Sequence, residues 1–321
     1  MNEHLVKQII ESTNFCLREE IQNLSSMKAG MTNNSYSFFV AGKQYIIRIP
    51  GEGTEQLINR RYEYDVYKAI EHLDISESVQ FFDPETGIKI SSFLENASAC
   101  NLDDFSDIQR CMEELRRFHT QQITVSHKFD LWERITYYES LLEGQPSCHG
   151  DYEAVKAEIL KLCSFVEEQP RAWTLCHIDS VPDNFLFENR AGANKVRLID
   201  WEYAGMQDPH VDIAMFAVYA MFDRADVDKL IDAYFTEGCP DLVRIKIYCY
   251  IAISGLMWSN WCEFKRKKGV EFGSYAQRQY DYAKEYTSYF KSEMQKLRNH
   301  TVKVHACRAQ VALLKMGERY S

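Results

Sequence analysis

The feature that most constrains this chain is a pair of short apolar runs, residues 185–187 and 196–199, joined by a turn-rich connection. This pattern predicts a β-hairpin. Asp179 and Asn184 lie five positions apart just before the first run, and Asp200 directly follows the second. A hairpin brings the start of its first strand next to the end of its second strand. The sequence therefore predicts that these three polar side chains meet at one end of the hairpin.

Two carboxylates and an amide in this arrangement suit phosphoryl transfer. That reaction needs a carboxylate that orients the attacking hydroxyl and accepts its proton, and oxygen ligands that hold Mg²⁺ against the phosphates. The spacing from His177 to Asn184, with an aspartate after the next strand pair, is typical of a kinase catalytic loop. We expect Asp179, with His177 in the same loop, to be catalytic, and Asn184 and Asp200 to bind the metal. The alternative is that the two carboxylates only cap loops or face solvent.

A second hairpin pattern lies near the N-terminus and is preceded by a loop of small and polar residues. Residues 36–49 form two β-rich runs around Ala41-Gly42-Lys43, which predicts a small antiparallel sheet. The chain contains no G-x-x-x-x-G-K-[ST] motif, and this excludes a P-loop fold. The preceding loop is expected to cover the phosphates of ATP, with an ordinary turn as the alternative. Its expected nucleotide-binding residues are Gly30, Thr32, Asn33 and Asn34.

Further candidates for nucleotide binding follow the second hairpin. Arg48 occupies the strand position at which a kinase has its phosphate-contacting lysine, and Glu63 on a helix expected over residues 54–72 is its candidate partner. A surface ion pair is the alternative. We also expect Phe93 and Leu94, where a strand-like run passes into a polar loop, to contact the nucleotide.

The order of these patterns predicts an α+β fold with two lobes, and the resemblance to a known kinase family given below implies that it is of the protein-kinase-like type. A strand pair is expected around residues 83–87, and the chain is expected to be mostly helical from Asp107 onward, apart from the hairpin region. We therefore predict a small N-terminal nucleotide-binding lobe with an antiparallel sheet over residues 1–95. A larger, mainly helical lobe for catalysis and substrate binding is predicted over residues 96–321.

These blocks resemble the choline/ethanolamine kinases, especially the bacterial choline kinases, within the wider aminoglycoside phosphotransferase-like group. The resemblance extends over about residues 27–290. It depends on Gly30-Met31-Thr32-Asn33-Asn34 with Arg48, on residues 177–184, and on Leu198-Ile199-Asp200-Trp201-Glu202-Tyr203-Ala204-Gly205 followed by Asp212-Ile213-Ala214. It implies a Mg²⁺- and ATP-dependent kinase that phosphorylates the hydroxyl of choline. One departure is Tyr219, near the position where eukaryotic members tend to carry a glutamate.

A fourth block looks like the region in which choline kinases build an aromatic pocket. Trp258 and Trp261 are three positions apart on a predicted helix, and Phe272 and Tyr275 follow. A quaternary ammonium has no N–H donors, so ring faces are its natural partners. We expect these four residues and Tyr203 to bind the substrate. Packing in a core is the alternative, because aromatic stripes at helical spacing usually face a core.

Several other acceptors and one different class of function remain open. Ethanolamine, another amino-alcohol, thiamine or an aminoglycoside would suit the same fold, although an aminoglycoside site would need more carboxylates than the aromatic block supplies. A catalytically silent small-molecule sensor is the alternative to an enzyme, and the intact set of Asp179, Asn184 and Asp200 argues against it.

Charge and cysteine content bear on partners and location. The formal net charge of −10 disfavours nucleic acid and anionic membranes as partners. No apolar run approaches the length of a membrane span, so we expect no membrane insertion. The ten cysteines form no C-x-x-C pair, which favours free thiols in the cytoplasm.

Overall fold

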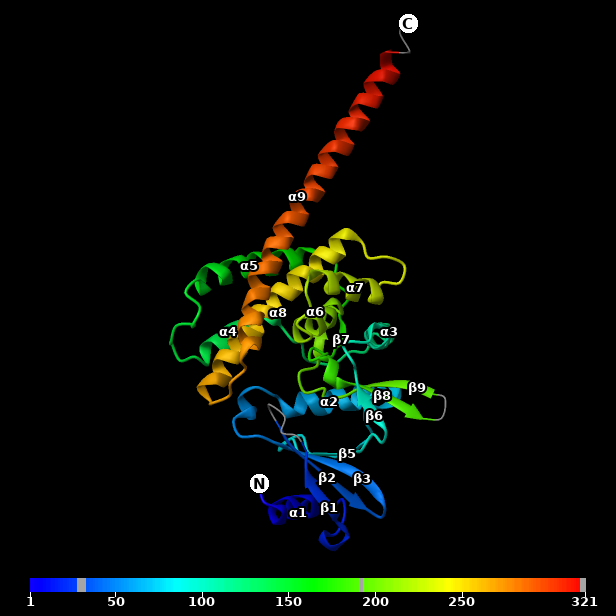
Figure 1. Cartoon of the computed structure of the whole chain (residues 1–321), viewed down its shortest axis with the longest axis vertical. Helices are drawn as coiled ribbons and strands as arrows, with labels where there is room; N and C mark the ends of the chain where they lie inside the picture. Colours follow the sequence, from blue (N-terminus) through cyan, green and yellow to red (C-terminus); the bar gives the residue numbers. More distant parts are fainter. Residues whose placement is uncertain (28–32, 191–192, 318–321) are drawn as a thin grey trace. The chain divides into compact units, whose positions relative to one another are not determined.

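The computed structural model describes residues 1–27, 33–190 and 193–317 (Figure 1). The chain packs as two compact units. The first comprises residues 1–130 and 171–236, and the second comprises residues 131–170 and 237–321. Helices and strands are both present, which confirms the predicted α+β composition. The boundary between lobes near residue 95 stays a prediction.

An antiparallel sheet of five strands forms the N-terminal part of the first unit. Its order is β1-β2-β3-β5-β4. The strands are β1 (Gln22–Ser26), β2 (Asn33–Val40), β3 (Lys43–Pro50), β4 (Val79–Phe82) and β5 (Lys89–Ser92). Helix α1 (Glu3–Ser12) contributes Val6 and Ile10 to the same apolar core as Phe38 and Ile47. The predicted antiparallel sheet and the strand pair around residues 83–87 are therefore confirmed.

The hairpin β2–β3 has the tight turn that its sequence predicts. Val40 pairs with Lys43, so only two residues form the loop. Ala41 and Gly42 both have positive φ, at 49° and 75°. Two consecutive positive φ angles are the signature of a type I′ turn, whose twist matches that of the strands. The turn aligns β3, and with it Arg48, along the sheet.

Helix α2 (Arg60–Ile70) is shorter than the helix expected over residues 54–72. The side chain of Asn59 accepts hydrogen bonds from the backbone N–H groups of Arg61 and Tyr62, which caps the helix there. The residues on either side form single 3₁₀ turns, Thr54–Gln56 and Glu71–Leu73. The predicted helix therefore exists, and its start is set by a cap that the apolar pattern did not reveal.

The rest of the first unit holds the predicted catalytic hairpin. Strands β8 (Phe185–Arg190) and β9 (Ala193–Leu198) pair in register, with Phe185 opposite Leu198, and β6 (Ala97–Ala99) extends this sheet. A separate pair is formed by β7 (Thr174–Cys176) and β10 (Gly205–Gln207). The helices of this part are α3 (Phe105–His119), α6 (His210–Tyr219) and α7 (Arg224–Tyr234). The hairpin expected from residues 185–199 is thus confirmed.

The second unit is a helical assembly. It contains α4 (Leu131–Ser140), α5 (Tyr152–Glu168), α8 (Asp241–Lys267) and α9 (Ser274–Gly317). Helix α8 packs against all three others. Gly255 allows α8 and α9 to approach closely, because a Cβ atom there would lie 2.6 Å from the carbonyl oxygen of Gln279. A side chain at this position would force the two helices apart.

Helix α8 is also long and apolar enough to cross a membrane, the one such helix found among the described residues. Most of its apolar window, 83%, is buried inside the structure. Its neighbours α4, α5 and α9 therefore account for its apolar composition without a membrane.

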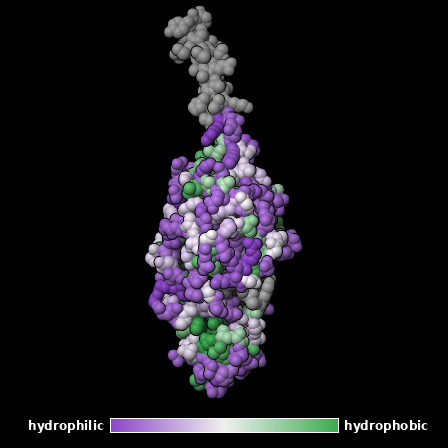
Figure 2. Space-filling model, turned by 90° about the vertical axis from the view of Figure 1, so that its left-hand side faces the viewer, coloured by the Kyte–Doolittle hydropathy of each residue, from purple (hydrophilic) through white to green (hydrophobic). Residues whose placement is uncertain are grey.

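Polar residues cover most of the face shown in Figure 2, and apolar residues gather over the region of the N-terminal sheet.

Candidate active site

The catalytic hairpin brings the predicted polar residues together at one end. The side-chain Nδ2 of Asn184 donates to the backbone oxygen of Asp179 at 2.8 Å and to its carboxylate Oδ2 at 3.3 Å. The backbone N–H of Ile199 donates to the carbonyl of Asn184 at 3.0 Å, which places Asp200 directly beside this pair. The structure thus shows the juxtaposition that the spacing predicted.

The orientation of these groups suits binding of a divalent cation. Because the amide nitrogen of Asn184 donates to Asp179, the amide oxygen is the atom of this side chain that could bind a metal. Carboxylate and amide oxygens are the donors that Mg²⁺ prefers. The side chain of Asp200 is 35% exposed, so it remains accessible. The donor set therefore fits Mg²⁺.

Two residues of the site have strained backbones. Ile178 and Asp200 have φ angles of 69° and 67°, in the left-handed region that side chains normally avoid. Such conformations persist only where surrounding contacts hold them. The positive φ of Ile178 turns the chain immediately before Asp179. The positive φ of Asp200 turns the chain at the predicted metal ligand itself.

Asp179 has the electrostatics expected of a base that works near neutral pH. Burial raises its pKa to about 7, with a smaller contribution from the nearby Glu202 carboxylate. Hydrogen bonds from Tyr219 and Asn184 act in the opposite direction, because they stabilise the charged carboxylate. The hydrogen bond places Tyr219 at the site.

Asp200 is held in an acidic environment that favours the arrival of positive charge. Although about a third of its side chain is exposed, partial removal from water raises the pKa of Asp200 well above its ordinary value, and repulsion from Glu202 adds to this effect. The guanidinium of Arg48 opposes both, and its Nη1 lies 3.8 Å from Asp200 Oδ1. A divalent cation would offset the same repulsion more strongly.

Arg48 and Glu63 form the ion pair that the sequence predicted, and it is buried rather than on the surface. Arg48 donates to both carboxylate oxygens of Glu63, with an Nη2–Oε2 distance of 2.9 Å, and also to the carbonyl oxygen of Gly87 at 3.1 Å. The Arg48 and Glu63 side chains are 7% and 0% exposed. The alternative of a surface pair is therefore wrong.

This pair belongs to a larger cage of charges that the sequence did not reveal. Arg60 donates to Glu63 and to Glu202, each at 2.9 Å, and to the side-chain oxygen of Asn33 at 3.0 Å. Asn33 in turn donates to Glu202 at 2.8 Å. Two arginines and two glutamates cancel in charge, so the cage binds β3, α2 and the segment after Asp200 without adding net charge.

The structure describes only part of the loop that is expected to bind phosphates. Asn33 is buried in the cage just described, whereas Asn34 is exposed on β2 opposite Ile49. Gly30 and Thr32 lie outside the described residues. The role of the loop in covering phosphates stays a prediction.

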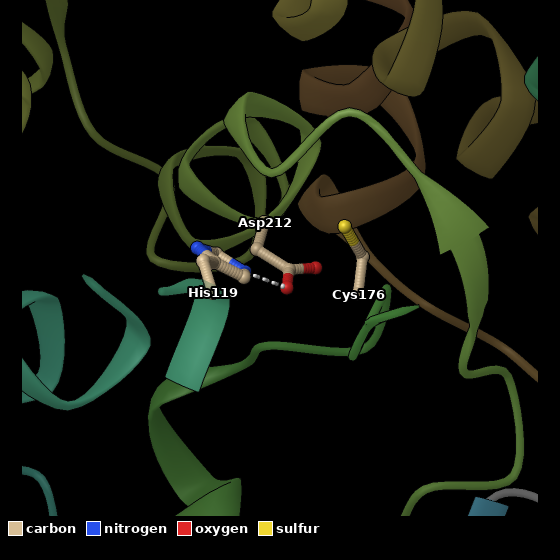
Figure 3. Close-up of side chains that lie close together, drawn as sticks. All are labelled: His119, Cys176 and Asp212. Carbon is tan, nitrogen blue, oxygen red and sulfur yellow. Dashed lines mark hydrogen bonds and ion pairs between the residues drawn. The ribbon is translucent and has the colours of Figure 1, made fainter. Parts of the chain in front are cut away.

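A buried carboxylate on α6 anchors the catalytic loop. Asp212 accepts the backbone N–H groups of His177 and Ile178 at 2.8 and 2.7 Å. The ring of His119, at the end of α3, donates to the same carboxylate at 2.9 Å, as the dashed line in Figure 3 shows. The hydroxyl of Tyr234 donates to the other ring nitrogen of His119, also at 2.9 Å. These contacts support the loop immediately before Asp179.

His177 lies in the core beneath the loop. Its Nε2 donates to the carbonyl of Ile199 at 2.9 Å, and its ring meets Trp201 edge to face at 4.5 Å. Burial lowers its pKa to about 4, so the ring is neutral at physiological pH. The geometry suits a residue that joins the catalytic loop to the segment of Asp200.

Phe93 and Leu94 directly follow β5. Together with Tyr67 and Arg197 they line a cavity of about 650 Å³. This cavity lies along α2 and the β4 edge, and its described lining includes neither Arg48 nor Asp200. The expected contact of these two residues with the nucleotide therefore stays a prediction.

The aromatic block forms a continuous chain of rings within the second unit. Trp258 meets Trp261 edge to face at 5.7 Å, Trp261 lies 5.3 Å from Phe272, and Phe272 lies 6.4 Å from Tyr275. The two tryptophans are almost fully buried, while Phe272 and Tyr275 are half-buried. Tyr203 belongs to the first unit, where its ring packs edge to face on Phe129 at 6.4 Å.

Several residues of the site were missed from the sequence. Arg60 lies three positions before Glu63, on the same helix face, and this spacing was an available signal. Glu202 and Asp212 lie in motifs that had been identified, but without a role. The helix-terminal His119 carried no signal, because its partners come from distant parts of the chain.

Comparison with known proteins identifies the family. The family model described as choline/ethanolamine kinase matches residues 24–229, which includes the catalytic loop, Asp200 and the charged cage. The chain belongs to the choline/ethanolamine kinase family. It is therefore a small-molecule kinase, a phosphotransferase that acts on an alcohol.

Individual members of the family are similar over most of the chain. Protein LicA from Haemophilus influenzae is 27% identical over 266 residues, which cover 79% of this chain and 77% of that protein. The crystal structure of choline kinase LicA from Streptococcus pneumoniae is 28% identical, with a TM-score of 0.77, covering 89% of this chain and 99% of that chain. A structure of LicA in complex with AMP is 29% identical, with a TM-score of 0.76 and coverage of 90% and 98%.

The same two-lobed kinase-like fold extends to more distant enzymes. A spectinomycin phosphotransferase shares it at 13% identity, with a TM-score of 0.53 over 92% of this chain and 99% of that chain. The predicted fold class, a small antiparallel-sheet lobe followed by a mainly helical lobe, is thus confirmed.

Proposed function

We propose that this family member transfers the γ-phosphate of ATP to the hydroxyl of choline and so produces phosphocholine. The observation that carries the proposal is the cluster formed by Asp179, Asn184 and Asp200 at the end of the hairpin. It combines a carboxylate whose pKa is raised to about 7 with oxygen donors for a metal. This combination has a chemical purpose in phosphoryl transfer and none in a protein that only binds.

In this proposal each residue of the hairpin has one task. Asp179 orients the choline hydroxyl and accepts its proton. Asn184 and Asp200 would hold Mg²⁺, which would neutralise charge on the transferred phosphoryl group. His177 acts as a catalytic-loop residue by holding Asp179 in place through its contact with Ile199.

ATP is expected to occupy the first unit. Arg48, fixed by Glu63, supplies positive charge beside Asp200. Asn33 and Asn34, with Gly30 and Thr32, are proposed to cover the phosphates, and Phe93 and Leu94 to contact the base. The complex of LicA with AMP supports a nucleotide as one substrate, because that structure is 29% identical to this chain.

Choline is favoured as acceptor by the aromatic chain in the second unit. A trimethylammonium group binds to ring faces, and Trp258, Trp261, Phe272 and Tyr275 supply four rings in contact. Trp261 already has a cation over its ring, since the Nζ of Lys265 lies 5.5 Å from the centroid. Tyr203 is proposed as a further wall of the substrate site. The similarity to a choline kinase from Streptococcus pneumoniae favours the same acceptor.

The proposed setting is the cytoplasm. The nine cysteines that the structure describes are free thiols, as expected in a reducing compartment. ATP and Mg²⁺ are available there. Small molecules, rather than nucleic acid or a membrane, are the proposed partners.

The experiment that tests the proposal measures Mg²⁺-dependent ADP release from ATP. Choline, ethanolamine, thiamine and kanamycin are supplied separately at equal concentration. We expect fast release with choline. Preference for another acceptor would keep the kinase and contradict choline as substrate, while silence with all four would contradict the proposed reaction with these alcohols.

A further inference from the structure

A second cluster of potential ligands lies in the helical unit. Cys148 and His149 are in the connection between α4 and α5, and Glu263 projects from α8. One donor atom from each residue lies within 4.8 Å of the other two. Thiolate, imidazole and carboxylate are the three ligand types that bind zinc in proteins.

The spacing of these donors is close to that of a tetrahedral metal site. Zinc bond lengths and a tetrahedral angle require donor–donor distances of about 3.3–3.6 Å. Here Cys148 Sγ lies 3.4 Å and His149 Nε2 lies 3.8 Å from the same atom, Glu263 Oε1. Two of the three distances between donor atoms are therefore within a few tenths of an ångström of the distances that a tetrahedral zinc site requires.

Surrounding contacts hold the donors in this arrangement. The carboxylate of Glu263 accepts hydrogen bonds from the hydroxyl of Ser147 at 2.6 Å and from the backbone N–H of Cys148 at 3.3 Å. The ring of His149 stacks on Tyr280, with centroids 3.6 Å apart and planes inclined by 2°. A site whose ligands are oriented by such neighbours loses little entropy when a metal binds.

The cluster is accessible and its charges can balance a divalent cation. It borders a cavity of about 190 Å³, and Cys148 is exposed. A thiolate and a carboxylate together neutralise a charge of +2. The Arg266 guanidinium, which also lines the cavity, hydrogen-bonds the side chain of Cys148, and the carboxylates of Glu263 and Glu271 offset its charge.

We propose that Cys148, His149 and Glu263 form a zinc-binding site, with water as the fourth ligand. Two other clusters in the described chain have comparable side chains but different surroundings. In the cluster of His119, Cys176 and Asp212 (Figure 3), all three side chains are buried, whereas Cys148 is exposed. Two backbone N–H groups and the His119 ring also donate to the Asp212 carboxylate. In the cluster of Glu63 and Glu202 with Asp200, two arginines already supply the positive charge.

A metal at this site would fasten the connection between α4 and α5 to α8. It would also border the segment that carries Phe272, because Phe272 and Gly273 line the same cavity. Zinc therefore acts as a structural clip in this unit, and its binding is measurable without substrate. The proposal is independent of which alcohol the enzyme phosphorylates.

The test uses the full chain stripped of metals with a chelator and titrated with Co²⁺ alone, then with Zn²⁺ as competitor. We expect one Co²⁺ per chain with a thiolate-to-cobalt charge-transfer absorption, and displacement of Co²⁺ by Zn²⁺. Thermal melting should show that Zn²⁺ raises the melting temperature of the stripped protein.

Variants identify the ligands. Cys148→Ser should abolish the charge-transfer absorption, and both Cys148→Ser and His149→Gln should weaken Zn²⁺ binding by at least about 100-fold. Cys239→Ser, a change at another partly exposed cysteine of the same unit, should bind as the wild type does. Absence of stoichiometric Co²⁺ binding by the wild type would overturn the proposal. So would wild-type affinity in both ligand variants.

Discussion

The side chain of Tyr219, the last residue of α6, hydrogen-bonds the carboxylate of Asp179. This contact opposes the effect of burial, which raises the pKa of Asp179 to about 7. The balance leaves the proposed base close to half-ionised at neutral pH. Tyr219 therefore tunes the proton acceptor, a role that its position in the sequence alone did not show.

Tyr219→Phe should move the pH dependence of the reaction. Only ionised Asp179 accepts a proton, so kcat/KM should rise through about pH 7 and then level off. Loss of the hydrogen bond destabilises the carboxylate and should shift this rise upward by about one pH unit. The measurement is kcat/KM as a function of pH, with Tyr62→Phe as the control. An unshifted profile in Tyr219→Phe would remove this tyrosine from the tuning of Asp179.

Asp179→Asn should lower kcat by about 10²- to 10⁴-fold or more while nucleotide affinity is retained. It should also stabilise the fold in a pH-dependent manner. Because the pKa of Asp179 is raised in the folded state, its contribution to stability is present at low pH and is lost as pH rises toward about 7. The melting temperature of the variant should therefore exceed that of the wild type at about pH 8, with little difference at about pH 4. A lower melting temperature at about pH 8 would contradict the raised pKa.

Arg60→Met should disrupt the charged cage. It leaves Glu63 and Glu202 buried with one cation fewer, and breaking a buried pair costs about 3–5 kcal/mol. Denaturant unfolding measures this loss, and kcat/KM should fall at least about 10-fold because Asn33 and Glu202 lose their common partner.

The neighbouring Arg61 offers a matched control. It pairs with Glu85 at 2.6 Å, but the two side chains are 56% and 77% exposed. Arg61→Met should therefore cost less than about 1 kcal/mol and leave kcat/KM unchanged. Equal effects of the two substitutions would show that the cage contributes nothing beyond an ordinary surface pair.

Trp261→Leu should weaken the binding of choline more than that of ATP. The substitution keeps an apolar side chain but removes the ring face, and a desolvated cation–π contact of about 2 kcal/mol corresponds to about a 30-fold rise in the KM for choline. The comparison is the KM for choline against the KM for ATP, with Trp173→Leu, 44% exposed in the wild type, as the control. An unchanged KM for choline would show that Trp261 packs in the core and does not bind the substrate.

Local patterns predicted much of the fold and part of the site. The hairpin β8–β9 was predictable because two short apolar runs joined by a turn-rich connection determine the strand pairing. This pairing brings Asp179 and Asn184, which precede the first strand, close to Asp200, which follows the second. The pair of Arg48 and Glu63 was predictable from the order of a strand and the next helix. Its burial was not, because the carbonyl of Gly87 and the side chain of Arg60 complete its surroundings.

The remaining site depends on long-range contacts. His119 and Asp212 are 93 residues apart, and Asn33 and Glu202 are 169 residues apart, so neither pair gives a local pattern. The helix expected over residues 54–72 was too long because the apolar period continues past the capping residue Asn59. Helical spacing of the aromatic residues did not distinguish a core from a substrate pocket. Trp258 and Trp261 are both buried, as in a core, and Trp261 also contacts the half-buried ring of Phe272.

The most direct test of the account is to identify the product by phosphorus NMR after incubation with ATP, Mg²⁺ and choline. We predict a phosphocholine signal that grows in step with ADP for the wild-type protein and is absent for Asp179→Asn under the same conditions. ADP formation without phosphocholine, or equal phosphocholine formation by both proteins, would contradict the proposed transfer of phosphate to choline at Asp179.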